Sequence, residues 1–313
     1  MKSKTSPRMV SLILALVLIA IGGFILFGRS IGDGYEHAEK YTAGDTSLSS
    51  PVENLDIHWT SGSLTVEYYD GSEILVRETS PRSLSEDDKL RWWLDGTTLR
   101  IQFRKGGFRW FSFSSPEKAL TVSLPKGLRL VSADIQATSA DVRLPDLAAD
   151  RLNLQSTSGD ITAAADANQL SAVSTSGSLQ ITLGSVDTVS LSSTSGGLGL
   201  TAQDASSVSL SSTSGAVAAS LDSAKKLSAS STSGGIVVAL RAFEDLSVSA
   251  TSGDVSASLP SAPGFTGAVS TTSGDFTSEI PLEKDGSTYT CGDGSARISI
   301  RTTSGDVRLI ESK

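Results

Sequence analysis

The chain has one cysteine, Cys291, and two histidines, His37 and His58, among its 313 residues. A single cysteine excludes an intramolecular disulfide. Without a Cys-x-x-Cys pair, a zinc site has too few ligands, and a Cys/His catalytic pair has too few candidates. We therefore predict no cofactor and no catalytic residue, and we interpret Cys291 as a buried or strand-lining thiol.

Aromatic residues make up only 6% of the chain and charged residues 19%, while Ser, Thr, Ala and Gly dominate. The net charge is −8, and residues 131–280 contain 5 Lys or Arg against 14 Asp or Glu. A protein that binds nucleic acid needs a basic patch or stripe, which this acidic stretch lacks. The composition therefore argues against nucleic acid as a partner.

What the chain has is a repeat built around Thr-Ser-Gly. A variant, Thr-Ser-Ala, begins at Thr138, and from there to Thr251 successive triplets are 18 or 19 residues apart. The full triplets begin at Thr60, Thr157, Thr175, Thr194, Thr213, Thr232, Thr251, Thr272 and Thr303. Self-similarity at a short fixed period is typical of a solenoid, in which each repeat packs only on its neighbours.

Aliphatic residues occupy fixed columns around each triplet. With its Thr as position zero, they lie at −5, −3, +4 and +6, as Leu152, Leu154 and Ile161 do around Thr157. Spacing by two on both sides predicts two short strands, each with one apolar face and with Ser and Thr exposed between the aliphatics. The triplet would be the sharp turn, with Gly supplying φ > 0. A looser corner, such as 204–206, would end each rung of about 19 residues.

A lone rung cannot bury its apolar face, so the rungs must stack. We predict an all-β fold, a parallel β-solenoid of two-strand rungs that coils right-handed, because parallel crossovers overwhelmingly take that hand. The regular repeats would span residues 131–311. At Thr272 the spacing stretches, so we expect the weakest rung there and an inserted loop over 281–295.

The N-terminal segment is apolar and uncharged over residues 9–27, which is long enough to span a bilayer as one transmembrane helix. Lys and Arg precede it, so the positive-inside rule predicts residues 1–8 as a cytoplasmic tail. Residues 28–50 would be a tether to a solenoid outside the cell, in a single-pass protein of the cell membrane. A cleaved signal peptide, with small residues at 20–22, is the alternative.

Residues 51–130 depart from the repeat after a first rung at Thr60. They contain a basic aromatic run at 103–113, with two interpretations: a cap over the open edge of the first rung, or a surface that docks a partner. The cap is the interpretation that we favour. The residues of the possible interaction surface are Arg104, Arg109, Trp110 and Phe111.

The same columns bear on three further functions. Asp residues after several triplets would stack as neighbours, Asp141 with Asp160 and Asp254 with Asp275, and could hold calcium. The calcium-binding nonapeptide pattern is absent, however. A carbohydrate-cleaving β-helix would need outward carboxylates, where this chain has Ser, Thr and Ala. An ice-binding ladder would need a flat sheet of Thr rather than Thr at corners.

The repeats resemble a bacterial β-strand-repeat family known as "putative adhesins", a domain of unknown function with LiaG-like membrane-anchored members. The resemblance rests on Leu-Pro-Lys-Gly-Leu at 124–128, on Asp134-Ile135, and on Thr-Ser-Gly-Asp-Ile/Val at 157–161, 251–255 and 303–307. It covers roughly residues 50–311. It implies a surface or envelope-stress protein without a catalytic residue.

We therefore predict a non-enzymatic, membrane-anchored surface solenoid that acts as an adhesin-like interaction module. Its partners would be the membrane, through the N-terminal helix, and an unknown envelope protein or surface ligand. The first alternative is an envelope-stress accessory protein that modulates a membrane signalling partner. The second is a carbohydrate-active β-helix.

Overall fold

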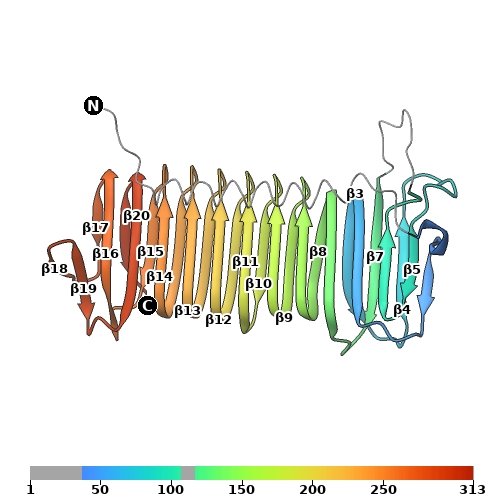
Figure 1. Cartoon of the computed structure of the whole chain (residues 1–313), viewed down its shortest axis with the longest axis horizontal. Helices are drawn as coiled ribbons and strands as arrows, with labels where there is room; N and C mark the ends of the chain where they lie inside the picture. The colour runs from blue at the N-terminus through green and yellow to red at the C-terminus, as the bar shows by residue number, and fades with distance from the viewer. Residues whose placement is uncertain (1–36, 107–116, 313) are drawn as a thin grey trace.

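Parallel strands fill the middle of the chain, as the repeat predicts. The computed structural model describes residues 37–106 and 117–312. Figure 1 shows the strands of this middle part side by side along the long axis of the molecule. They are β8 (Leu130–Ser156), β9 (Ile161–Ser174), β10 (Leu179–Leu183), β11 (Val186–Ser193), β12 (Leu198–Ser212), β13 (Val217–Ser231), β14 (Ile236–Ala250) and β15 (Val255–Leu259).

Equivalent residues of successive rungs pair in register. Leu198 of β12 pairs with Val217 of β13, and Leu210 pairs with Ala229. The aliphatic columns at −5, −3, +4 and +6 are buried throughout this part, with Leu198 and Leu210 each at most 2% exposed. Each apolar side chain therefore packs on its counterpart one rung away. The all-β prediction and the buried columns are confirmed.

The prediction of two separate strands per rung is wrong for the central rungs. β12, β13 and β14 each run for 15 residues through the expected looser corner. At that corner Asp204 still pairs with Ser223, and Ala205 with Ala224. The chain bends there without breaking the ladder, because parallel neighbours that bend alike keep their backbone hydrogen bonds.

The position just before each triplet was predicted to be exposed, and that prediction is wrong. Its serines are buried, and most of their hydroxyls bond to the turn: the Gly196 amide donates to Ser193 Oγ at 2.8 Å, and the Gly215 amide to Ser212 Oγ at 2.8 Å. A buried hydroxyl needs such a partner. Ser174 is the exception, because its Oγ has no hydrogen-bond partner among the described residues. The members of this buried column are Ser156, Ser174, Ser193, Ser212, Ser231 and Thr302.

In the central rungs, the triplet glycines are required by close stacking and not by the positive φ that the sequence suggested. Gly196 and Gly215 do not lie in the left-handed region, whereas Gly62 does, with φ 93°. A Cβ on Gly196 would lie 2.0 Å from the carbonyl oxygen of Gly177, and one on Gly215 would lie 2.0 Å from that of Gly196. No side chain fits between these stacked turns.

At the N-terminal end the rungs do not follow chain order. β3 (Asn54–Tyr69) pairs in parallel with β8 on one side and with β6 (Thr98–Gln102) and β7 (Lys118–Pro125) on the other. The predicted first rung at Thr60 is therefore an interior rung. Antiparallel strands cover its outer neighbours: β5 (Arg91–Asp95) on β6, and β4 (Ile74–Thr79) on β7. Three short elements precede them: η1 (Ala38–Lys40), β1 (Thr42–Ala43) and β2 (Thr46–Leu48).

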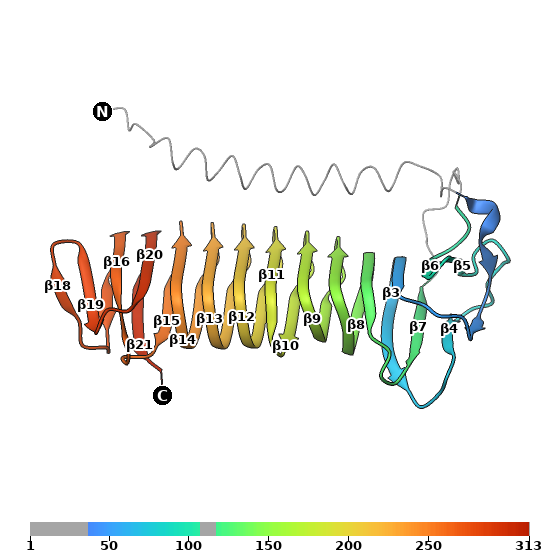
Figure 2. The same ribbon diagram turned by 60° about the horizontal axis from the view of Figure 1, so that its bottom comes forward.

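The C-terminal end is built in the same way. β20 (Ala296–Ser304) and β21 (Val307–Glu311) insert between the rung of β14 and β15 and the rung of β16 (Gly264–Ser273) and β17 (Phe276–Ser278). The predicted loop over 281–295 contains a hairpin, β18 (Glu283–Asp285) and β19 (Thr288–Gly292), and β19 covers β16 antiparallel. Figure 2 shows this hairpin at one end, and β4 and β5 at the other.

Cys291 lies on β19 and is 4% exposed, so its interpretation as a buried thiol is confirmed. Burial raises the pKa of this thiol, and the nearby charge of Glu311 adds to the rise. Since the thiolate is the reactive form, both effects keep the sulfur inert.

The predicted tail at 1–8 and the predicted transmembrane helix at 9–27 lie outside the described residues, as do residues 28–36 of the predicted tether at 28–50. The described part of that segment is not a free linker, because β1 pairs antiparallel with β5 and β2 with β4. Within residues 37–106 and 117–312, no helix is long and apolar enough to cross a membrane. The membrane anchor therefore stays a prediction.

Candidate functional site

A hollow of about 340 Å³ lies on the outward face of the sheet near the N-terminal end of the stack. It is formed by β6, β3 and the first part of β8, three strands that lie far apart in the sequence and pair side by side. Its lining is almost entirely polar: Asn54, Asp56, His58, Thr98, Arg100, Ser132, Asp134 and Gln136, with Leu55.

Strand register arranges these side chains in rows that cross the strands. Arg100 of β6 pairs with Asp56 of β3, which pairs in turn with Asp134 of β8. The second pass of β8 continues this row with Asn153, whose Nδ2 donates to Asp134 Oδ1 at 2.7 Å. We call Arg100, Asp56, Asp134 and Asn153 the charged row.

The charged row is held together by its own contacts. Arg100 Nη1 donates to Asp56 Oδ2 at 2.5 Å, and Arg100 also contacts Asp95 of β5 at 3.3 Å. On the other side, His58 Nε2 lies 3.1 Å from Asp56 Oδ1. Burial alone would raise the pKa of Asp56, but the hydrogen bonds and charges of His58 and Arg100 outweigh it and lower that pKa. Asp56 is thus an ionised anchor for two neighbours.

An aromatic cluster closes the hollow at its outer end. The Arg100 guanidinium lies 5.8 Å from the centre of the Trp93 ring, and Lys40 Nζ lies 4.7 Å from it. His37 and Tyr41 meet the same ring edge-on, with centroid distances of 5.7 and 5.6 Å. The cation–π contact with Trp93 helps to orient the Arg100 guanidinium toward Asp56.

A second row runs two residues further along each strand. His58 of β3 pairs with Gln136 of β8. The backbone hydrogen bond from Thr157 N to Ala137 O brings the second pass of β8, with Gln155, beside the first. We call His58, Gln136 and Gln155 the amide row, and the two rows together the polar face. No described residue hydrogen-bonds to the side-chain amides of Gln136 and Gln155, and both residues are half-buried.

The polar face is confined to this end of the stack. In the central rungs, the positions that correspond to Asp56 and His58 hold serine, as Ser190 and Ser192 on β11 and Ser209 and Ser211 on β12 do. Both sets face outward from strands of the same kind. The concentration of planar hydrogen-bonding side chains on β3 and β8 is therefore not a requirement of the fold.

Behind the polar face, a buried ion pair fixes the terminal strands. Lys118 Nζ lies 2.8 Å from Glu78 Oε2, with the Lys118 side chain fully buried. It also donates to the carbonyl oxygens of Asp88 and Phe103, and it lies over the rings of Trp59 and Phe103. Burial lowers the pKa of the Lys118 ammonium, while the contact with Glu78 opposes that shift.

The predicted interaction surface is only partly within the described residues. Arg104 is half-exposed and directly follows Phe103, whose ring is buried edge-on against Trp59 at 4.8 Å. Arg109, Trp110 and Phe111 lie outside the described residues. The start of the basic aromatic run is thus part of the core, and both interpretations of its remainder stay predictions.

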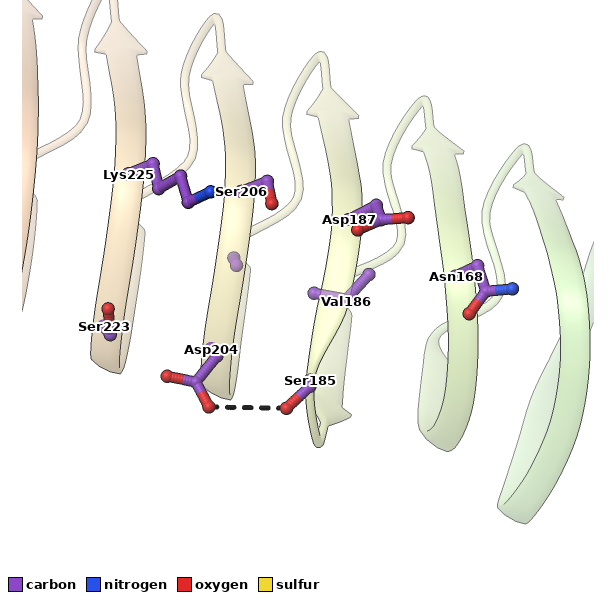
Figure 3. Close-up of a pocket in the computed structure, with 9 residues that line it drawn as sticks. Asn168, Ser185, Val186, Asp187, Asp204, Ser206, Ser223 and Lys225 are labelled. Carbon is purple, nitrogen blue, oxygen red and sulfur yellow. Dashed lines mark hydrogen bonds between the residues drawn. The ribbon is translucent and has the colours of Figure 1, made fainter.

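A second hollow, of about 380 Å³, lies at the bend of the central rungs. Figure 3 shows its side chains on neighbouring strands, with Ser185 Oγ donating to Asp204 Oδ2 at 3.3 Å as the one hydrogen bond among the residues drawn. Lys225 and Asp187 also line this hollow. Most of the residues that line this hollow have short side chains, and apart from the bond between Ser185 and Asp204 no hydrogen bond among the residues drawn orients them.

The Asp column acts as a set of turn caps. Asp141 Oδ1 accepts from the Asp160 amide at 3.1 Å, and Asp160 Oδ1 accepts from the Ser178 amide at 2.8 Å. The prediction that Asp254 and Asp275 are adjacent is wrong, because Asp306 lies between them. The Asp306 amide donates to Asp254 Oδ1, and Asp306 Oδ1 accepts from the Asp275 amide. Among the described residues, no three His, Cys, Asp or Glu side chains gather as metal ligands would.

Comparison with known proteins identifies the family. The family model Toastrack DUF4097 matches residues 52–310, so the chain belongs to that family, and the resemblance seen in the repeats is confirmed. No curated protein sequence matches the chain.

Solved structures show similar chains at low identity. A "putative adhesin" from Parabacteroides distasonis is 14% identical with a TM-score of 0.48, covering 89% of this chain and 98% of its own. A "putative adhesin" from Parabacteroides merdae is 12% identical with a TM-score of 0.47, covering 88% and 97%. A "putative lipid binding protein" from Parabacteroides distasonis is 15% identical with a TM-score of 0.45, covering 88% and 97%.

Sequence reasoning missed the polar face, although a signal for it was present. In each repeat, the positions four and two residues before the triplet form two columns. They hold Asp56 and His58 before Thr60, and Asp134 and Gln136 before Thr138, whereas the four repeats from Thr194 to Thr251 hold Ser at both. The two repeats are 78 residues apart in the chain, so nothing in the sequence alone marks them as neighbours.

Proposed function

We propose that this protein is a membrane-anchored β-solenoid, exposed outside the cell, that binds a surface ligand through its polar face. The N-terminus would lie in the cytoplasm, with residues 9–27 as the single membrane span. The protein would act as an adhesin-like interaction module without catalysis.

The observation that carries this proposal is the restriction of the polar face to one end of the stack. Serine suffices on the outward face of the central rungs, as Ser209 and Ser211 show. At the polar face, longer planar side chains line a hollow and are oriented by neighbours on adjacent strands. Preorganised polar groups around a concave surface are what binding sites require.

The state of the carboxylates supports binding rather than catalysis. A general acid at neutral pH needs a raised pKa, but the pKa of Asp56 is lowered by His58 and Arg100, against the effect of its burial. Asp134 accepts a hydrogen bond from Asn153. Both carboxylates therefore act as fixed hydrogen-bond acceptors.

The location is tested by adding a protease to intact cells. We expect cleavage in the part of the predicted tether that precedes β1, with release of a fragment of nearly full length, because β1 and β2 are paired with β5 and β4. The same protease added to broken cells is the control for accessibility. Protection of the C-terminal part in intact cells would place it in the cytoplasm and overturn the proposal.

The binding surface is tested by photocrosslinking in intact cells with the full chain. We expect the double variant Asp134→Ala, Gln136→Ala to lose its crosslinked partner while its thermal melt stays close to that of the wild type. The competing variant carries Arg104, Arg109, Trp110 and Phe111 all changed to Ala. If only this second variant loses the partner, and it melts normally, the basic aromatic run is the binding surface and the polar face is not.

A further inference from the structure

The geometry of the amide row points to an uncharged, polyhydroxylated chain, a neutral glycan, that lies along the long axis of the stack. This inference rests on the proposed function and names the ligand class of the same surface. The side-chain amides of Gln136 and Gln155 each offer an acceptor oxygen and a donor NH₂ group, and no described residue uses either.

A hydroxyl group is also both donor and acceptor, so it can satisfy either end of an amide. A ligand with hydroxyls on successive units could pair with each member of the row in turn. His58 adds a further nitrogen, because only its Nε2 is directed toward Asp56. The row therefore matches a ligand that is dense in hydroxyl groups.

The spacing of the row favours a polymer rather than a single small molecule. His58, Gln136 and Gln155 lie on three successive passes of the sheet, which are about 4.8 Å apart. This step is comparable to the length of one sugar residue in an extended β-linked polysaccharide. A chain along the stack would present about one sugar to each pass.

Charge argues for a neutral ligand. In the hollow, the guanidinium of Arg100 is bound to Asp56 and Asp95, so it is not available to an anionic polymer. Asp56 and Asp134 would repel such a polymer. The amide row itself is formally uncharged apart from any proton on His58.

A peptide strand suits this surface less well. An added strand binds through an unpaired sheet edge, where backbone groups are free. β3 is paired on both sides, with β6 and with β8, so the polar face presents side chains rather than backbone. A protein partner is thus the alternative that the experiment must detect.

The backbone that carries the row is preorganised, which lowers the cost of binding. This backbone is fixed in a parallel ladder, and the charged row beside it is held by hydrogen bonds of 2.5 and 2.7 Å. Binding then has to order the side chains of Gln136 and Gln155, but not the strands that carry them.

The test is affinity electrophoresis of the full chain in detergent, through gels that contain a single polysaccharide. Neutral β-1,4- and β-1,3-glucans, a mannan and a galactan serve as probes, and polygalacturonate is the anionic comparison. We expect at least one neutral polysaccharide to retard the wild type. Gln136→Ala with Gln155→Ala should weaken that retardation at least tenfold, measured as apparent Kd.

The matched control is Gln180→Ala with Gln203→Ala, the same chemical change at exposed positions on β10 and β12. It should leave retardation unchanged, and both double variants should melt like the wild type. Retardation by polygalacturonate alone, or equal loss in both double variants, would overturn the inference. A third outcome separates the two proposals. If the wild type still crosslinks to a partner in cells through the polar face, but no neutral polysaccharide retards it, the inference that the ligand is a glycan is wrong and the proposed function stands.

Discussion

Gly196 and Gly197 stand side by side in the chain but meet different surroundings. A Cβ on Gly196 would lie 2.0 Å from the Gly177 carbonyl oxygen, whereas one on Gly197 would meet its nearest neighbour, the Ala216 oxygen, at 3.8 Å. Both glycines lie outside the left-handed region. Packing, and not backbone strain, therefore distinguishes them.

We expect Gly196→Ala to lower the free energy of unfolding by about 1–3 kcal/mol, because the rigid backbone of the adjacent turn must move. Gly197→Ala should change it by less than about 0.5 kcal/mol. Urea denaturation of the two full-length variants measures both values. Equal effects would mean that the turns are not stacked at this distance.

The buried serine column offers a second comparison of adjacent residues. Ser193 Oγ accepts from the Gly196 amide at 2.8 Å within the core, whereas Ser192 is half-exposed on the outward face. Ser193→Ala should cost about 1–3 kcal/mol, since it leaves a buried N–H without a partner. Ser192→Ala should be neutral within about 0.5 kcal/mol. Thermal melts that rank these variants in the opposite order would contradict the hydrogen bond.

Asp56 gives a prediction for acid stability. Its pKa in the folded protein is lowered from the ordinary value of 3.8, because His58 and Arg100 outweigh the effect of its burial. Between 3.8 and the lower folded value, the unfolded chain binds more protons than the folded one, so stability falls as pH falls. The stabilisation is complete above pH 3.8 and is lost below the folded pKa.

Asp56→Asn should therefore flatten the loss of stability on acidification in this window, as measured by urea midpoints at a series of pH values. Asp204→Asn, at an exposed corner, is the control. A variant with the same pH slope as the wild type would show that Asp56 is not paired as described.

At the scale of elements, the ends of the stack interleave. β21 pairs with β15 through Arg308 and Ser256, and with β17 through Arg308 and Thr277. The last strand of the described chain is thus held between two others, and the antiparallel hairpin of β18 and β19 covers the outermost rung. Covered ends prevent edge-to-edge association with other chains.

Disulfide trapping tests whether β21 lies between β15 and β17. In a Cys291→Ala background, Ser256→Cys with Arg308→Cys should crosslink under mild oxidation, because adjacent strands are about 4.8 Å apart. Ser256→Cys with Thr277→Cys should not, since two strand spacings, about 9.6 Å, exceed the reach of a disulfide. Mobility on non-reducing gels gives the result. The reverse outcome would show that the strands stack in chain order, with β17 directly beside β15.

The sequence predicted the rungs well because burial enforces their columns. It could not predict the interleaving, since the repeats at Thr272 and Thr303 both carry Thr-Ser-Gly-Asp and either one fits beside the repeat at Thr251. The order depends instead on the hairpin within 281–295, whose pairing is a tertiary feature. The polar face escaped prediction for the same reason, because it forms only when β3 packs against β8.

At the scale of the whole molecule, each rung depends on its two neighbours for its core. Stability is then close to a sum of rung and interface contributions, so damage in one rung should spread to those adjacent to it. The polar face lies several strands from β12, with β9 and β11 between them. A destabilising substitution in β12 can therefore test how far local unfolding extends toward the polar face.

Leu210→Asp should destabilise β12 by roughly 4 kcal/mol or more, because it buries a carboxyl group among aliphatic side chains. Ser209→Asp is the matched control, since Ser209 is exposed on the same strand. Hydrogen exchange followed by mass spectrometry should show protection lost in β11, β12 and β13, with protection of β3 falling least. If Leu210→Asp instead removed protection equally from β12 and β3, the molecule would unfold as a single unit, and damage at any rung would be transmitted in full to the polar face.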